Sequence, residues 1–246
     1  MLGQTGRDIS PVFSIPWLTH QQFRIDWLHC CDQGVAADFA GNFFKCVAKR
    51  IPGRNNKERT SALWVRLSAW YSAYDIRDKL PCLTVTMIQS SKKAPKLRAS
   101  AACCRALVPF MHELAMEMLD PGKPEELAVQ AAAEALHNCY RTLSASAHFE
   151  HGYLMEQSIL FAQQYVALSL HASDDLTWRV KPKLHMWLEL CQEGSKPSLF
   201  WCYRDEDFGG SVAAMSKHRG GKYSAHGMSK RLLQHFLIKQ PVVRLA

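Results

Sequence analysis

Apolar residues recur every three or four positions through most of this chain, which is the spacing of one helix face. Between 35 and 49 the stripe consists of Val35, Phe39, Phe43 and Val47. Between 56 and 74 it consists of Leu63, Leu67, Trp70 and Tyr74. Segments rich in Ala, Leu and Met predict further helices at 96–119, 124–148 and 153–171, and Pro182 suits the start of another.

Two short runs depart from this pattern. The run QFRID (22–26) and the run TVTMI (84–88) are typical of short strands. Asn56 follows a loop and is a candidate N-cap of the helix behind it. The pattern therefore predicts a mainly α fold with a few short strands near the ends of the chain.

The composition is that of a globular protein. Of the 246 residues, 48% are hydrophobic and 21% are charged. No apolar run approaches the roughly 18 residues of a membrane span, and the first residues do not have the pattern of a signal peptide. These features predict no membrane association and a nuclear or cytoplasmic location, in which the cysteines would be reduced, mostly structural thiols.

The formal net charge of +8 is concentrated near the C-terminus, since no acid follows Asp207 and seven Lys and Arg residues do. A basic segment of this kind suits a polyanion such as DNA, and a solvated basic surface explains it equally well. The candidate nucleic-acid-binding residues are Lys217, Arg219, Lys222, Lys230 and Arg231.

Two spacings place a histidine and an acid on one helix face. Asp26 and His29 are three residues apart, and His185 and Glu189 are four apart. Either pair could contribute metal ligands. In the alternative interpretation Asp26 caps the following turn and His29 only packs beside its neighbours.

An acidic triplet lies among aromatic residues in the run WCYRDEDF (201–208). Acids at the start of a helix are stabilised by the helix dipole, which is an ordinary explanation for Asp205, Glu206 and Asp207. Three consecutive acids cannot all face one way, however. If one of them is buried beside the aromatic rings, it needs a cation or a metal as its partner.

The stretch PKLHMWLEL…PSLFWCYRDEDFGGSVAAM (182–215) resembles the C-terminal catalytic segment of DDE-type cut-and-paste transposases, in particular the CACTA (En/Spm-like) group. That family carries an aromatic residue before a Glu-x-Phe-x-Gly signature, and Trp201, Glu206, Phe208 and Gly210 match it. The stretch SIPWLTHQQFRIDWLHCCDQGV (14–35) resembles the same family's Asp-x-x-His signature and its following glycine. Asp26, His29 and Gly34 match that signature.

The resemblance implies an RNase H-like core in which three carboxylates hold magnesium for attack on DNA phosphodiesters. Glu206 would be the third acid, and Asp8 is the candidate for the second. We therefore expect an incomplete catalytic set that needs acids from a second copy or a partner chain. An active form would perform magnesium-dependent DNA strand transfer or cleavage. Asp26, His29, His185 and Glu189 are the candidate scaffold residues, and zinc is a candidate ion for them.

The expected organisation has three parts. Residues 1–33 form an extended segment with the Asp-x-x-His motif, residues 34–180 a helical insertion domain, and residues 181–246 a C-terminal segment with the Glu206 motif and a basic helical tail. The flanking parts would be partial RNase H-like elements, and Asp26 and His29 would lie beside His185. The leading hypothesis is a transposase-derived, DNA-associated protein that is not catalytic alone. The alternative is a helical protein-interaction module without a catalytic role.

Overall fold

Helices dominate the part of the chain that the structure describes. The computed structural model describes residues 14–19, 22–145, 148–218, 226–227, 229–231 and 233–234. The mainly α fold is confirmed, and the described residues contain no strand. The strands expected at 22–26 and 84–88 are therefore wrong, and no RNase H-like sheet occurs among the described residues. No described helix is both long and apolar enough to cross a bilayer.

The chain divides into two units, Met1–Phe200 and Trp201–Ala246. The second unit contains α9, Tyr203–His218. The first unit contains the π-helix η3, Leu28–Ala36, so the segment expected to be extended through residue 33 is helical from Leu28 on. Residue 181, expected to start the last segment, lies within this first unit too. The remaining elements of the first unit are α1 (Ala37–Ala48), α2 (Asn56–Ala73), α3 (Val85–Ile88), α4 (Ala101–Ala106), α5 (Val108–Met118), α6 (Pro124–Ser144), α7 (His151–Leu170), α8 (Pro182–Gln192) and η4 (Pro197–Leu199).

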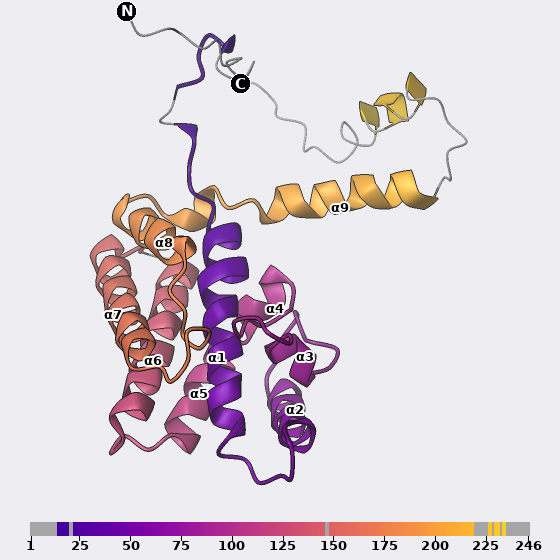
Figure 1. Cartoon of the computed structure of the whole chain (residues 1–246). Coiled ribbons are helices and arrows are strands. Elements are labelled where there is room, and N and C mark those ends of the chain that lie inside the picture. Colours follow the sequence, from indigo (N-terminus) through magenta and orange to yellow (C-terminus); the bar gives the residue numbers. More distant parts are fainter. Residues whose placement is uncertain are drawn as a thin grey trace, which may run out of the picture. The chain divides into compact units, whose positions relative to one another are not determined.

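Helix α1 forms the centre of the first unit. Helices α5–α8 lie on one side of it and α2–α4 on the other (Figure 1). The expected apolar stripe is confirmed, because Val35, Phe39, Phe43 and Val47 are all buried. Burial is not confined to that stripe, however. The polar side chains of Asp38 and Asn42, on the same helix, are buried as well.

Asp38 and Asn42 are satisfied by the segment between α7 and α8. Lys181 Nζ lies 2.7 Å from Asp38 Oδ1, and the backbone N–H of Trp178 donates to Asn42 Oδ1 at 2.8 Å. Trp178 has a φ of 56°, a conformation that is uncommon for a bulky residue. Its ring is buried against Phe39 and Tyr165 at centroid distances of 5.9 and 5.7 Å. The hydrogen bond and the ring contacts together hold this strained backbone in place.

Gly41 allows another chain segment to lie directly against α1. A Cβ atom at this position would be 2.3 Å from the backbone nitrogen of Lys96 and 2.5 Å from its Cα. The same segment is fixed by a hydrogen bond from the backbone N–H of Leu97 to the carbonyl of Ala37, at 2.8 Å. The segment 95–97 is therefore extended across the helix, which is why the helix expected from 96 begins only at Ala101.

Several expected boundaries differ for local reasons. The run 84–88 forms the short helix α3, because Thr84 caps it by accepting from the backbone N–H of Met87 at 3.3 Å. The cap of α2 is Asn55 and not Asn56, since Asn55 Oδ1 accepts from the N–H of Glu58. Tyr74, expected in the core stripe of α2, follows the end of that helix and is 49% exposed.

Substituting Gly41 by alanine should destabilise the protein strongly. The added methyl group would meet backbone atoms of Lys96, which cannot move aside as a side chain can. We expect a loss of about 1–3 kcal/mol or more in the free energy of unfolding. Urea denaturation followed by circular dichroism measures it.

Gly152→Ala is the matched control, since nothing lies within 4 Å of a Cβ at this position of α7. Alanine is also the better helix former there, so this variant should gain about 0.5–1 kcal/mol. Equal stability of the two variants would contradict the close approach at Gly41.

A histidine pair between α5 and α6 should make stability depend on pH. The rings of His112 and His137 lie 4.7 Å apart, and the pKa of His137 is lowered to about 4 by burial, then by His112 and Arg141. The unfolded chain takes up this proton near pH 6.5, and the folded chain does so only near pH 4. Stability is therefore full above about pH 6.5 and is lost as the pH falls toward 4.

Melting temperatures measured between pH 7 and pH 5 test this effect. The drop should be smaller in His137→Gln than in the wild type. The control His171→Gln alters an exposed histidine and should follow the wild-type curve. A His137→Gln curve parallel to the wild type would exclude the histidine pair as the cause.

Candidate functional site

Asp26 and His29 form a local pair at the start of η3. Asp26 Oδ2 accepts from the backbone N–H of His29 at 2.9 Å and lies 2.7 Å from His29 Nδ1. The spacing had predicted that the two side chains share a face, and this is confirmed. The contact to the backbone amide is that of a cap at a helix start.

His185 and Glu189 form a second local pair, on α8. His185 Nε2 lies 3.1 Å from Glu189 Oε1, and the two side chains are 77% and 54% exposed. These residues and the Asp26–His29 pair belong to the same unit, but no three of their ligand atoms lie within 4.8 Å of one another. The structure therefore does not gather the four side chains into one coordination sphere.

Several contacts join the two motif segments. Arg24 pairs with Glu193 at 2.6 Å, and Trp27 packs edge-on against Trp187.

A further contact comes from Lys183, which sequence reasoning did not select. Its Nζ donates to the backbone carbonyl of His29 at 2.6 Å, and η3 and α8 pack together. Its aliphatic stem lies over Gly34, where a Cβ atom would be 2.7 Å from Lys183 Cδ. Gly34 and Lys183, one from each motif segment, thus meet in one contact.

Lys183 belongs to a cluster of three lysines, Lys96, Lys181 and Lys183. Lys96 Nζ donates to the carbonyl of Gln33 at 2.6 Å, one turn along η3 from the carbonyl that Lys183 contacts. Burial lowers the pKa of Lys96, the charges of Lys183 and Lys181 lower it further, and Asp38 opposes them. Within this lysine cluster Lys181 pairs with Asp38, and Lys96 lies in range of the charges of Asp38, Lys181 and Lys183.

The two carbonyl contacts bear on the π-helix itself. A π-helix of nine residues is unusual, since most occur as single-turn bulges, often at functional sites. Each carbonyl in a π-helix accepts from the N–H of the residue five positions later, so its turns are wider than those of an α-helix. Ammonium groups that donate to the carbonyls of His29 and Gln33 stabilise such a turn from outside.

The inner side of η3 carries a buried carboxylate that sequence reasoning also missed. Asp32 is fully buried, and the hydroxyl of Tyr140 on α6 donates to its Oδ1. Cys31 Sγ lies 3.4 Å from the same hydroxyl, and Trp27 packs edge-on against the Tyr140 ring. The pKa of Tyr140 is raised well above its ordinary value, by burial and then by the Asp32 charge. The hydroxyl therefore stays protonated and remains the donor to Asp32.

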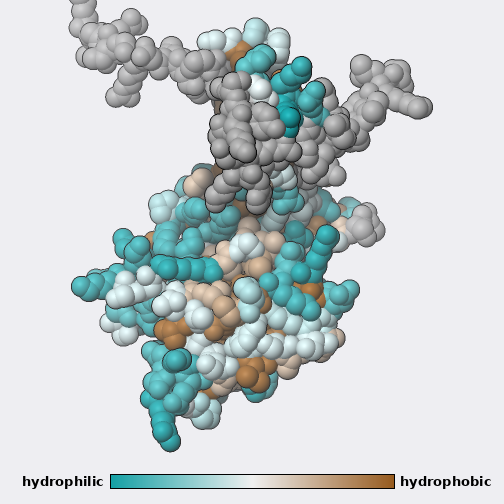
Figure 2. All heavy atoms as spheres, turned by 90° about the vertical axis from the view of Figure 1, so that its right-hand side faces the viewer, coloured by the Kyte–Doolittle hydropathy of each residue, from teal (hydrophilic) through white to brown (hydrophobic). Residues whose placement is uncertain are grey.

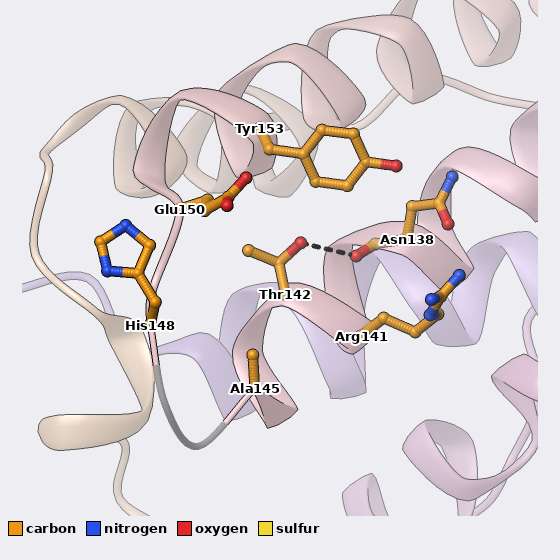
Figure 3. A pocket seen from close by; sticks show the side chains of 7 residues that line it. All are labelled: Asn138, Arg141, Thr142, Ala145, His148, Glu150 and Tyr153. Atoms are coloured by element: carbon orange, nitrogen blue, oxygen red, sulfur yellow. Dashed lines mark hydrogen bonds between the residues drawn. The ribbon is translucent and has the colours of Figure 1, made fainter.

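A hollow of about 340 Å³ lies where the end of α6 meets the start of α7 (Figure 3). Its lining residues are Asn138, Arg141, Thr142, Ala145, His148, Glu150 and Tyr153. Arg141 and Glu150 give it one charge of each sign, and Thr142 Oγ1 already donates to the carbonyl of Asn138 at 2.9 Å. This mixed lining does not concentrate charge of one sign.

The candidate catalytic acid Glu206 lies in the first turn of α9, where Asp205 and Asp207 flank it. All three side chains are exposed, so the aromatic neighbours do not bury them. The helix expected at this triplet is confirmed. The backbone N–H of Glu206 donates to the carbonyl of Cys202 at 2.9 Å, which is a hydrogen bond of the first helical turn. Asp8 lies outside the described residues.

The candidate DNA-binding residues are described only in part. Lys230 and Arg231 are exposed and helical. Lys217 lies in α9, but its side chain is outside the described atoms, as are the whole of Arg219 and Lys222.

A comparison with models of protein families, with curated proteins and with solved structures found no match. The function of this chain therefore has to be inferred from its own residues.

Lys183→Met tests whether the lysine contact supports η3. Methionine keeps much of the stem over Gly34 but cannot donate to the His29 carbonyl. We expect a loss of about 1 kcal/mol in the free energy of unfolding, measured by urea denaturation. The control Lys93→Met alters an exposed lysine whose ammonium makes no hydrogen bond or ion pair within the described residues, and it should change stability little. Equal stability of the two variants would mean that the contact contributes nothing.

Proposed function

We propose that this chain is a DNA-associated protein derived from a DDE-type transposase, and that it does not cut DNA by itself. The observation that carries the proposal is the charge distribution. Seven positive residues and no acid follow Asp207, in a chain whose formal net charge is +8. A segment with positive charges and no acid of its own is attracted to a phosphate backbone along its whole length.

The described geometry of this segment supports the proposal. Helix α9 extends to His218, and the described residues between 226 and 234 are helical as well. Lys230 and Arg231 are exposed there, so their charged groups can reach a phosphate. Cationic residues on helices are a common means of positioning a protein on DNA without reading its sequence.

We expect no DNA cleavage by this chain alone because it offers too few carboxylates to hold the metal ions. Two-metal phosphoryl transfer needs several carboxylates around the metal ions. The family resemblance gives Glu206 one of these roles and leaves Asp8 as the candidate for another. We propose that a second copy or a partner chain supplies what is missing, and that magnesium binds this chain only weakly on its own.

The outer face of α7 favours a second candidate function, a helical protein-interaction module. Ile159, Val166 and Leu170 are 36%, 39% and 78% exposed on this helix. They are spaced seven and four residues apart, which places them along one face. An apolar stripe in this position suits contact with another protein and has no role in binding phosphate.

Salt dependence tests the DNA proposal. The logarithm of the association constant should fall linearly with the logarithm of salt concentration, with a slope of about −0.9 for each phosphate that the protein neutralises. Changing Lys217, Arg219 and Lys222 together to glutamine should flatten that slope. Fluorescence anisotropy with a labelled duplex oligonucleotide between 50 and 200 mM salt, roughly the range in which such binding weakens most, measures both.

The triple variant Arg77→Gln/Lys92→Gln/Arg179→Gln is the control, since it removes the same charge from exposed positions before the basic segment. It should retain most of the slope. Wild-type protein incubated with magnesium and supercoiled plasmid should leave the plasmid intact. Binding that ignores both salt and the first triple substitution would reject the proposal and favour the interaction module.

A further inference from the structure

A cleft with positive charges and hydroxyl groups lies between α1, α2 and α3 in the first unit. It consists of two adjoining hollows of about 120 and about 380 Å³, which share Thr60 and Val85 in their linings. The three helices contact one another. Helices α2 and α3 lie on the side of the unit that Figure 2 turns toward the viewer. Hydrophilic side chains surround smaller apolar patches on this side (Figure 2).

The lining of the cleft contains ammonium groups and no carboxylate. Lys45 and Lys49 line the smaller hollow, and Lys57 lines the larger one. Lys45 Nζ contacts Thr177 Oγ1 at 3.1 Å. The ammonium groups of Lys49 and Lys57 make no hydrogen bond or ion pair with any residue that the structure describes. No carboxylate among the lining residues therefore neutralises the positive charges of Lys49 and Lys57.

Thr60 supplies a hydroxyl group that lacks a partner. Its side chain is only 4% exposed, and it lines both hollows. Within the described residues the Thr60 hydroxyl makes no hydrogen bond. The buried polar atoms without a partner do not include the Thr60 hydroxyl, so its oxygen reaches the surface and can donate to a ligand oxygen in the cleft.

Other groups around the cleft suit an anionic oxygen as well. The hydroxyl-bearing side chains Ser61, Thr84 and Thr86 line the larger hollow. Helix α2, which is 18 residues long, begins at Asn56, and Asn56 lines the smaller hollow. That N-terminus is already capped by the Asn55 side chain and carries the Glu58 carboxylate in its first turn, so it adds little attraction for an anion. The apolar part of the lining, Ala48, Val85 and Ile88, suits a sugar or a base rather than a second charge.

We propose that this cleft binds a phosphate ester, and that in the intact protein the phosphate belongs to the backbone of a bound DNA strand. Lys49 and Lys57 neutralise the phosphate charge, and the Thr60 hydroxyl donates to one of its oxygens. The DNA part of this inference rests on the function proposed above. The phosphate part stands on the cleft alone.

Thr60→Val is the sharpest test, because valine has the shape of threonine and lacks the hydroxyl. Since that hydroxyl makes no hydrogen bond within the described residues, the melting temperature should stay the same or rise. Affinity for a duplex oligonucleotide should nevertheless fall about three- to tenfold. The control Thr142→Val removes a hydroxyl that donates to the Asn138 carbonyl. It should lower the melting temperature and leave DNA affinity unchanged.

The double variant Lys49→Gln/Lys57→Gln tests the charges. Its salt slope should be flatter by about 0.9 for each phosphate that the variant no longer neutralises. The double variant Arg77→Gln/Arg179→Gln removes the same charge at exposed positions that do not line the cleft, and it should keep the wild-type slope. Thymidine 5′-monophosphate, followed by ³¹P NMR line broadening, probes the cleft without a DNA strand. Wild type should broaden the line, and Lys49→Gln/Lys57→Gln should not.

The outcomes separate this inference from the proposed function. If DNA binds and both cleft variants bind it like the wild type, the cleft inference is overturned and the DNA function stands. If DNA does not bind but the mononucleotide is broadened through Lys49 and Lys57, the DNA function fails and the cleft is a site for small phosphate esters. If neither probe binds, both proposals are rejected.

Discussion

The first unit is organised by the burial of α1, in which only Lys45 and Cys46 are partly exposed. A helix covered over most of its surface buries polar residues as well, and each buried polar group needs a partner. Asp38 and Asn42 obtain theirs from Lys181 and from the backbone of Trp178. These two contacts fix the segment that leads from α7 to α8, and they impose a left-handed backbone conformation on Trp178.

The position of α8 follows from the same constraint. Once Lys181 is held by Asp38, Lys183 lies two residues further on and reaches the carbonyl of His29 in η3. On the opposite flank the close approach at Gly41 brings Lys96 to the carbonyl of Gln33. The lysine cluster is thus a consequence of how two segments cross α1. Its ammonium groups serve the backbone of η3 and the carboxylate of Asp38, which distinguishes them from Lys49 and Lys57 in the cleft.

Periodicity made the core of α1 predictable, because Phe39, Phe43 and Val47 follow the spacing of one helix face. It did not reveal that Asp38 and Asn42 are buried, since their partners are more than 130 residues away in the sequence. The run at 84–88 predicts a strand from its composition, but a run this short has no period that separates strand from helix. Only the cap at Thr84 decides it.

The candidate site was predicted less well for a related reason. Spacing places two side chains on one face, and both the Asp26–His29 and the His185–Glu189 contacts occur. The contacts between the two motif segments, however, pair Arg24 with Glu193 and Lys183 with the His29 carbonyl, and spacing within one segment cannot pair residues that are so far apart in the sequence. The buried Asp32 was overlooked because its partner, Tyr140, lies on α6 in a different part of the chain.

The two proposed contacts with DNA would contribute in physically different ways. A basic tail gains affinity by releasing counterions, and it does so at any position along a strand. A cleft with a fixed hydroxyl and fixed ammonium groups accepts a phosphate only where its oxygens meet those donors, so it sets the position and orientation of the protein on the strand. Thr60 is buried on a rigid helix, so ordering it on binding costs less conformational entropy than ordering an exposed lysine does. The tail would therefore bring the strand to the protein, and the cleft would determine where the strand is held.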